Sequence, residues 1–160
     1  MIINQLIFGF YGSNLVKDKF HTGTLICTSE FGNLRFMATS GQKHYQGIGS
    51  CNKKGKGGIP PCKLVGIDKY TVSLRPIFMP QVKGVEGNFY QIFPFKVLVN
   101  QYGKKTARGD FGIHRDANVP GSAGCIVIPS GEHWQEFEEL MKKLSDKGIK
   151  TLDLFVSTSY

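Results

Sequence analysis

Glycine and proline interrupt this chain at short intervals, and this spacing constrains its fold more than any other feature. The 160 residues include 20 glycines and 7 prolines, spread along the whole length. Both residue types end helices and mark turns, so few uninterrupted segments remain that are long enough for a helix. Short runs of β-branched and aromatic residues lie between them, as in residues 23–28 and 88–100. The chain is therefore predicted to be mostly β.

Most of these runs are predicted as strands joined by turns, and the first three are expected to form a meander. The predicted strands cover residues 2–10, 23–28, 33–39, 68–74, one or two strands within 88–100, 111–114, 125–128 and 151–156. The second and third are expected to form a hairpin across residues 29–32. The connections include residues 11–14, a Gly/Lys loop at 42–63, an irregular stretch at 75–87 and a basic turn at 102–110.

One segment after these strands carries the pattern of a helix. Ser130 is the predicted N-cap, acidic residues follow in the first turns and lysines in the last, which suits the helix dipole. Gly148 is predicted to end the helix, and His133 is expected on its surface. The apolar residues fall on one stripe, formed by Trp134, Phe137, Leu140, Met141 and Leu144. The fold class is therefore α+β, mostly β with one helix in the C-terminal region.

Length and composition indicate one folded domain over residues 1–160. The hydrophobic fraction of 41% and the aromatic fraction of 12% exclude a disordered chain. There are no internal repeats and no linker long enough to divide the sequence. A run of about 18 apolar residues, which a membrane-spanning helix needs, is missing, so no membrane span is predicted.

The net charge of +8 favours a polyanionic partner. Nucleic acid, an anionic cell wall and an acidic membrane surface all fit, and charge alone does not choose among them. Residues 1–10 are apolar but lack the basic start and the small-residue cleavage site of a signal peptide. We therefore expect a first strand there and no recognisable signal peptide.

Residues 111–128 hold the strongest chemical signal in the chain. His114 and Cys125 stand 11 positions apart, at the ends of two predicted strands with a turn-rich segment between them. A thiol attacks a carbonyl only as thiolate, and a neighbouring imidazole can take its proton. Gly124 permits a tight backbone conformation beside the thiol, where N–H groups are expected to stabilise an oxyanion. His21 and His44 lack such a context.

The sequence gives less evidence of a function for the other cysteines. Cys51 and Cys62 flank the Gly/Lys loop, and either a disulfide or two reduced thiols is consistent with the sequence, the reduced form being favoured. A metal site built from these two and His44 is disfavoured, because a close Cys-x-x-Cys pair is missing. We predict neither a metal nor a cofactor.

The stretch around Cys125 resembles the catalytic domain of the L,D-transpeptidase (YkuD-type) family. The resemblance lies in a histidine in an Ile-His strand end, then Ser-x-Gly-Cys, an apolar strand, a helix and a strand, with histidine before cysteine. It implies a β-sandwich or barrel in which Cys125 is the nucleophile, His114 its base and Ser122 part of the signature turn. It also implies a backbone carbonyl as the partner that orients His114. This chain departs from the family in a shorter His–Cys interval and in Ala123, where His or Arg is common.

The resemblance implies a cysteine transpeptidase or peptidase, a hydrolase or acyltransferase, that acts on peptidoglycan stem peptides. The short interval and the missing signal favour hydrolysis at the bacterial cell wall, by an enzyme delivered as a phage or virion component or as an effector. Arg115 and Asp116 are weaker candidates for substrate contact. The basic turn with Lys104, Lys105 and Arg108 is predicted either to be solvated, which is favoured, or to attract a stem-peptide carboxylate.

Two other hypotheses remain open. The chain is alternatively a non-catalytic module that keeps the fold and binds the wall or other phage particle subunits. A basic nucleic-acid binder is the third hypothesis, and it rests on charge alone, since the sequence holds no helix-turn-helix, zinc-finger or RNP signature. No specific nucleic acid is predicted as partner.

Overall fold

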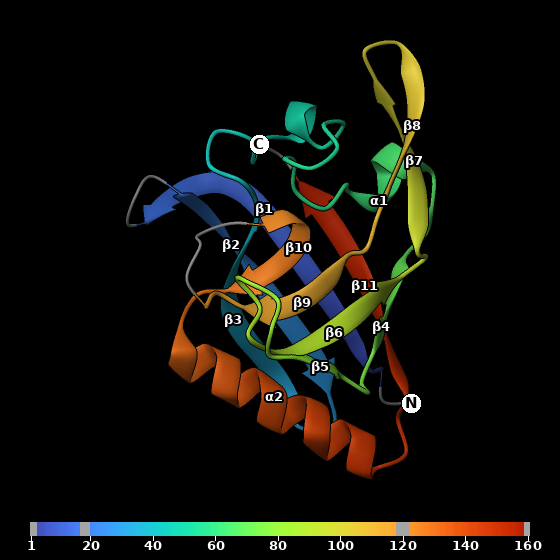
Figure 1. Ribbon diagram of the computed structural model, residues 1–160. Helices are drawn as coiled ribbons and strands as arrows, with labels where there is room; N and C mark the ends of the chain where they lie inside the picture. Colours follow the sequence, from blue (N-terminus) through green and yellow to red (C-terminus); the bar gives the residue numbers. More distant parts are fainter. Residues whose placement is uncertain (1–2, 17–19, 118–121, 159–160) are drawn as a thin grey trace.

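Eight strands close into a barrel in the computed structural model, which describes residues 3–16, 20–117 and 122–158 (Figure 1). Around the barrel the order is β4, β11, β1, β2, β3, β10, β9 and β6, and β6 pairs with β4 to close the ring. The barrel strands are β1 (Gln5–Val16), β2 (Phe20–Ser29), β3 (Gly32–Gly41), β4 (Tyr70–Ser73), β6 (Gly87–Phe93), β9 (Gly112–Arg115), β10 (Ser122–Ile128) and β11 (Thr151–Thr158). Two neighbouring pairs are parallel, β1 with β11 and β9 with β10.

The remaining elements extend the barrel at its edges. Strand β5 (Ile77–Met79) pairs with β6 outside the ring. Strands β7 (Lys96–Gln101) and β8 (Lys104–Gly109) form a separate hairpin, which projects from the upper end of the barrel in Figure 1. The short helices η2 (Ile48–Ser50) and α1 (Cys62–Val65) lie in the segment that leads to β4, at the same end.

The barrel interior holds the main hydrophobic core. Successive side chains of a strand point to opposite faces, and β11 alternates accordingly, with Leu152, Leu154 and Val156 buried. Burial of these apolar side chains supplies the main driving force for folding, about 25 cal/mol per Å² removed from water. The interior side chains of β9 and β10 belong to this core.

Helix α2 (Gly131–Asp146) runs along the lower end of the barrel in Figure 1. Ser130 is its N-cap, with Oγ accepting a hydrogen bond from the His133 backbone N–H at 3.3 Å. The predicted apolar stripe is buried, and Phe137 packs edge-to-face against Phe36 and Tyr90. His133 was expected on the surface, but it is half-buried, and its Nδ1 accepts a hydrogen bond from the Met37 N–H.

The prediction of a mostly-β protein with one main helix is confirmed, as is the hairpin of β2 and β3. Four local predictions were wrong. Residues 104–109 form β8 rather than a turn, because their backbone pairs fully with β7. Residues 11–14, expected as a connection, belong to β1, whose register with β2 shifts between Gly9 and Asn14. The loop at 42–63 holds two short helical turns, and the stretch at 75–87 contains β5.

Candidate active site

The parallel pairing of β9 and β10 sets His114 and Cys125 on one face. Val127 lies opposite His114, so Cys125 is two positions back along the neighbouring strand. With strands about 4.8 Å apart and a rise of about 3.3 Å per residue, the two Cα atoms are separated by roughly 8 Å. The alternation of strand side chains turns His114, Cys125 and Val127 away from the barrel interior. The register therefore places His114 and Cys125 on one face, on neighbouring parallel strands.

A small apolar cluster covers this outer face. It consists of Val85, Phe89, Cys125 and Val127, with Met79 packed against it, and we call it the outer cluster. The Phe89 ring stacks on the His114 imidazole, with centroids 6.0 Å apart and planes 21° from parallel. Phe89 also lies directly over Gly112, where a Cβ would overlap its ring. Residues 79–89, which we call the covering segment, thus shield the site from solvent.

The His114 imidazole is oriented by backbone carbonyls. Its Nδ1 lies 2.6 Å from the Arg115 carbonyl oxygen. His114 as a whole is 5% exposed. When Nδ1 donates its proton to this carbonyl, Nε2 is the basic nitrogen. Burial lowers the pKa of His114, while hydrogen bonding to the backbone of Arg115 and Gly84 and the charge of Asp116 act in the opposite direction. Burial outweighs the other effects, so the pKa is lowered, and the Arg115 carbonyl fixes the direction of the ring.

The two weaker candidates next to His114 do different things. Arg115 donates from Nη2 to the Glu86 carbonyl at 2.6 Å and from Nε to the Val85 carbonyl at 3.4 Å. It therefore ties the covering segment to β9. Asp116 is half-buried, and burial raises the pKa of its carboxyl while the charge of His114 lowers it. The structure thus gives Arg115 a role in holding the cover.

Cys125 sits at a constrained point of β10. It is 8% exposed, and its Sγ lies 3.8 Å from the Asp110 carbonyl oxygen. Its own carbonyl accepts a hydrogen bond from Ser40 Oγ at 2.7 Å, and that hydroxyl also accepts from the Ile59 N–H at 2.8 Å. Gly124 before it has φ of 104°, a conformation that favours glycine. Ser122 begins β10, but its side chain lies outside the described part of the structure.

Arg108 reaches Gly124 from the β7–β8 hairpin. Its guanidinium is 2% exposed and stacks near the Phe111 ring at 5.4 Å. A Cβ at Gly124 would lie 2.9 Å from Nη2. Burial lowers the pKa of Arg108, and negative charge on Cys51, Tyr70 and Cys125 opposes that shift. By the same interaction the guanidinium favours the thiolate form of Cys125.

The prediction that Arg108 lies in a solvated turn was wrong, because the residue is buried. It lies in β8 and donates to the carbonyl oxygens of Cys51, Gly57 and Gly58 at 2.6, 2.8 and 2.7 Å. It therefore fastens the Gly/Lys loop to the base of the hairpin, because these carbonyls come from the loop and Arg108 from the strand. Lys104 and Lys105 are exposed farther along β8, as a solvated segment requires.

Two of the other cysteines lie in surroundings that disfavour a thiolate. Burial raises the pKa of the Cys27 thiol to about 12. Burial raises that of Cys51 to about 11, although the charge of Arg108 lowers it. Cys62 accepts a hydrogen bond from the Val156 N–H at 3.4 Å. Cys51 and Cys62 are both free thiols, each buried in its own place.

The other histidines lie apart from the outer cluster. His21 lies in β2, and its backbone N–H donates to Gln46 Oε1 at 2.8 Å. His44 is exposed in the Gly/Lys loop, with φ of 68°. Within residues 3–16, 20–117 and 122–158, no group of three or more His, Cys, Asp or Glu side chains is arranged to hold a metal ion.

Comparisons with known protein families, curated proteins and solved structures find no match for this chain. Across the described residues, no helix is long and apolar enough to cross a membrane.

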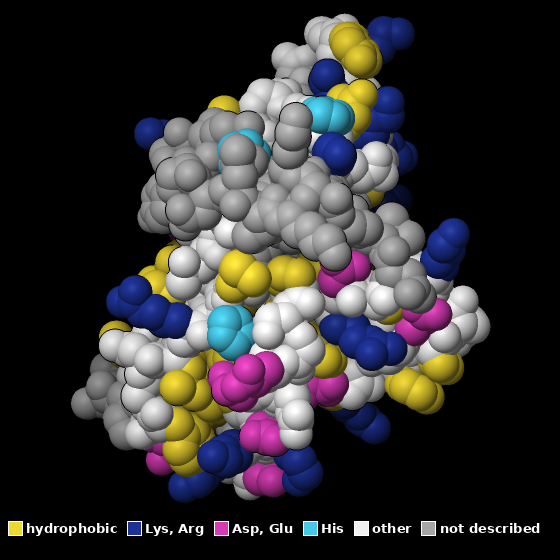
Figure 2. All heavy atoms as spheres, turned by 90° about the vertical axis from the view of Figure 1, so that its left-hand side faces the viewer, with side chains coloured by type: hydrophobic (Ala, Val, Ile, Leu, Met, Phe, Trp, Pro, Cys, Tyr) yellow, Lys and Arg dark blue, Asp and Glu magenta, His cyan; other side chains and the backbone are white. Residues whose placement is uncertain are grey.

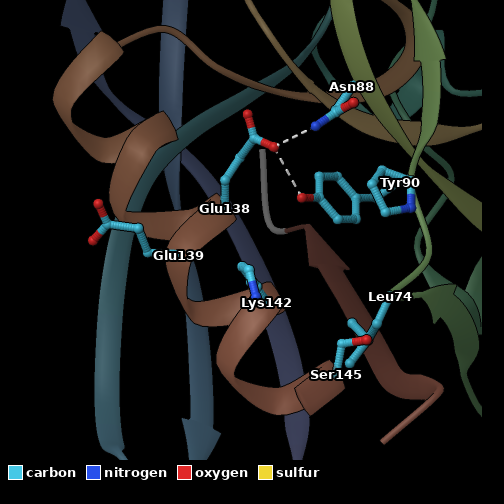
Figure 3. Close-up of a pocket in the computed structure, with 8 residues that line it drawn as sticks. Leu74, Asn88, Tyr90, Glu138, Glu139, Lys142 and Ser145 are labelled. Atoms are coloured by element: carbon cyan, nitrogen blue, oxygen red, sulfur yellow. Dashed lines mark hydrogen bonds between the residues drawn. The ribbon is translucent and has the colours of Figure 1, made fainter.

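A hollow of about 360 Å³ lies between β6 and α2 (Figure 3). Glu138 points from α2 toward β6, where its Oε2 accepts hydrogen bonds from Asn88 Nδ2 at 2.7 Å and Tyr90 OH at 3.1 Å. Burial raises the pKa of Tyr90, and the neighbouring Glu138 charge raises it further. This carboxylate serves to fasten the helix to the barrel.

Two features of the site escaped the sequence analysis. Phe89, which covers His114, was assigned only to an aromatic strand. The signal that points to it is Gly112, because a glycine inside a strand often marks a close approach by another group. The burial of Arg108 carried no local signal, since its hydrogen-bond partners stand 50 to 57 positions away in the sequence.

Proposed function

We propose that this chain is a cysteine enzyme that acts on peptidoglycan stem peptides, with Cys125 as nucleophile and His114 as base. The observation that carries the proposal is the register of β9 and β10, which gives both side chains one face of the barrel wall. The buried Arg108 guanidinium beside Gly124 adds a fixed positive charge that favours the thiolate. The resemblance to L,D-transpeptidases around Cys125 supplies the substrate class.

In the proposed reaction, His114 accepts the thiol proton, and the thiolate attacks the carbonyl carbon of a stem-peptide amide. A C–S bond forms while one electron pair of the carbonyl moves to oxygen. When the tetrahedral intermediate collapses, the C–N bond breaks and the amine leaves with the proton that His114 returns. Water then attacks the thioester, a C–O bond replaces the C–S bond, and the thiol is regenerated. An amine acceptor in place of water gives transpeptidation.

The surroundings of His114 suit the role of base. Burial lowers its pKa, which favours the neutral imidazole, the form that accepts a proton. The Arg115 carbonyl holds Nδ1, as the resemblance implies for the orienting partner. The Phe89 ring on the other side limits the rotation of the imidazole.

The test is digestion of purified tetrapeptide muropeptides, followed by mass spectrometry of the products. We expect the wild type to release the terminal residue, and Cys125→Ser to be slower by at least about 10³-fold, because the nucleophile is lost. His114→Gln is expected to be slower by about 10²–10⁴-fold, the range for a general base. Cys27→Ala is the matched control, since it removes a thiol from the core and leaves the site intact.

Far-ultraviolet circular dichroism of each variant establishes that the fold is kept. Undiminished cleavage by Cys125→Ser would exclude Cys125 as nucleophile. Intact muropeptides with the wild type under all acceptor conditions would exclude the proposed activity on this substrate.

The burial of Cys125 favours a second candidate, a non-catalytic module that binds the wall. Cys125 is 8% exposed beneath the covering segment, as an inert thiol would be. This candidate predicts that the wild type and Cys125→Ser bind isolated sacculi equally in a sedimentation assay, and that neither changes the muropeptide profile.

A further inference from the structure

A second hollow lies at the base of the β7–β8 hairpin, next to the start of β10. Its volume is about 320 Å³. The residues that define it come from the Gly/Lys loop, from the hairpin and from β10, and we call it the basic hollow. They include Lys54, Lys96, Arg108, Asp110 and Ala123.

The charge of the basic hollow is mainly positive. Three of its side chains are cationic, and Asp110 is the one carboxylate among its lining residues. The surrounding segments add no negative charge, because residues 31–67 and 87–109 contain neither Asp nor Glu. In Figure 2 the basic side chains in the upper part of the view have no acidic ones among them, whereas the middle and lower parts carry both.

Arg108 at the wall of this hollow is a buried cation without a carboxylate partner. It is 2% exposed, and within the described part of the chain no Asp or Glu forms an ion pair with it. Buried charges are ordinarily paired, because desolvation costs several kcal/mol per ion. The carbonyls of Cys51, Gly57 and Gly58 take three of the five N–H donors of the guanidinium. Donors on Nε and Nη2 that these carbonyls do not use are thus available to an anion.

The basic hollow adjoins Cys125. Asp110 lines the hollow, and its carbonyl oxygen lies 3.8 Å from Cys125 Sγ. Ala123, another lining residue, stands two positions before the cysteine. Arg108 Nη2 lies 2.9 Å from the position of a Cβ at Gly124. A substrate whose anionic group occupies the hollow would therefore present a carbonyl to the thiol from only a few bonds farther along the same molecule.

We infer that the basic hollow is a carboxylate-binding subsite, which holds an acidic group of the acyl donor while Cys125 attacks a carbonyl nearby. The identity of the donor rests on the proposed function, whereas the preference for a carboxylate rests on the charges of the hollow. Arg108 supplies a directional donor, and Lys54 and Lys96 supply the surrounding positive potential. The Gly/Lys loop thereby acquires a role in substrate binding.

The first test compares alkylation of Cys125 by iodoacetate and by iodoacetamide. The two reagents share a leaving group and differ in one carboxylate, so the ratio of their rates reports the preference for an anion beside the thiol. Peptide mass spectrometry assigns the modified cysteine. We expect the ratio in the folded wild type to exceed the ratio in the urea-unfolded chain. In Lys54→Gln/Lys96→Gln the ratio is expected to fall about three- to tenfold, because two charges near the reagent are lost.

Lys104→Gln/Lys105→Gln is the matched control, because it removes two charges of the same hairpin that do not line the hollow. The ratio is expected to change by less than about twofold in this variant, because screening weakens distant charges. An equal fall in both double variants would overturn the subsite in favour of general surface charge. Failure of both reagents to modify Cys125 would also overturn it, since the inference requires an open hollow beside the thiol.

A second measurement uses glutarate as the carboxylate probe. Glutarate is expected to slow the alkylation of Cys125 by neutral iodoacetamide in the wild type and not in Lys54→Gln/Lys96→Gln. Glutaramide, which has the same length and no charge, is expected to have no effect. Equal protection by glutarate and glutaramide would contradict carboxylate recognition.

These readouts separate the subsite from the proposed function, because neither requires cleavage of a peptide. Protection by glutarate together with intact muropeptides would keep the subsite and exclude the stem-peptide substrate. Cleavage of muropeptides at the same KM in the wild type and Lys54→Gln/Lys96→Gln would exclude the subsite and keep the activity.

Discussion

The two faces of the β9–β10 pair differ sharply in how they are covered. The inner face presents Ile113, Ile126 and Ile128, each 0% exposed and part of the main core. The outer face presents His114 and Cys125, and the covering segment packs over both, with Phe89 stacked on the imidazole. The same two strands thus carry the stability of the barrel on one side and the candidate chemistry on the other.

This difference shows how a barrel wall supports a reactive group. The inner face fixes the backbone, because buried apolar side chains from the eight barrel strands and from α2 belong to the same core. The outer face depends on a short segment with few contacts, and such segments open locally at a lower free-energy cost than the core. We therefore expect changes on the inner face to act on stability and changes on the outer face to act on access to the thiol.

The largest expected difference in stability is between substitutions at two neighbouring residues of β10. Ile126→Ala is expected to lower the free energy of unfolding by about 2–5 kcal/mol, because it leaves a cavity in the main core. Cys125→Ala removes a single sulfur atom from the smaller outer cluster and is expected to cost about 1 kcal/mol or less. Urea unfolding followed by tryptophan fluorescence measures both, since Trp134 packs against the core.

Equal losses in the two variants would break the contrast, because the outer face would then contribute as much to stability as the core. The alkylation rate of Cys125 in folded Ile126→Ala is the accompanying control. It is expected to match the wild type, since the covering segment is untouched.

A substitution at Gly112 is expected to have an effect of intermediate size, because this residue lies in β9 directly beneath the Phe89 ring. A Cβ there would overlap the Phe89 ring, so Gly112→Ala must displace the ring from the site. We expect a loss of about 1–3 kcal/mol from overpacking, and faster alkylation of Cys125 by iodoacetamide because the cover is lifted. Gly49→Ala is the matched control, since a Cβ at Gly49 meets nothing within 4 Å. Slow, unchanged alkylation in Gly112→Ala would mean that Phe89 does not limit access.

Local signals predicted most elements of the fold, although they missed β5 and β8. The capping serine and the apolar stripe predicted α2, and the turn at residues 29–32 predicted the hairpin of β2 and β3. The same kind of signal located β9 and β10, because β-branched and apolar residues surround His114 and Cys125. Closure of the barrel through β4 and β6 had no such signal, since it depends on pairing between distant strands.

The surroundings of the site could not be predicted from the sequence for a related reason. Lys104, Lys105 and Arg108 look alike as a basic run, yet only Arg108 points into the protein, where loop carbonyls accept its hydrogen bonds. Lys104 and Arg108 lie on the same face of β8, but Lys104 is next to the hairpin turn, whereas Arg108 is at the hairpin base beside the Gly/Lys loop. This difference becomes visible only once the pairing with β7 is known. Likewise, the role of Arg115 depends on the position of the covering segment, about 30 positions earlier in the chain.

Arg115 provides the smallest and most selective test. Its guanidinium is exposed and holds the covering segment through the carbonyls of Val85 and Glu86. Arg115→Gln is expected to lower the free energy of unfolding by no more than about 1 kcal/mol, because the hydrogen bonds it loses are partly replaced by water. Alkylation of Cys125 by iodoacetamide is nevertheless expected to become faster, because the segment opens more often.

Arg35→Gln, at an exposed position of β3, is the matched control. Neither its free energy of unfolding nor its rate of Cys125 alkylation is expected to change. A faster reaction without a loss of global stability would separate local opening of the outer face from unfolding of the inner face. Reaction rates that follow global stability across all variants would instead mean that the two faces open together, and that the covering segment is part of the same cooperative unit as the barrel core.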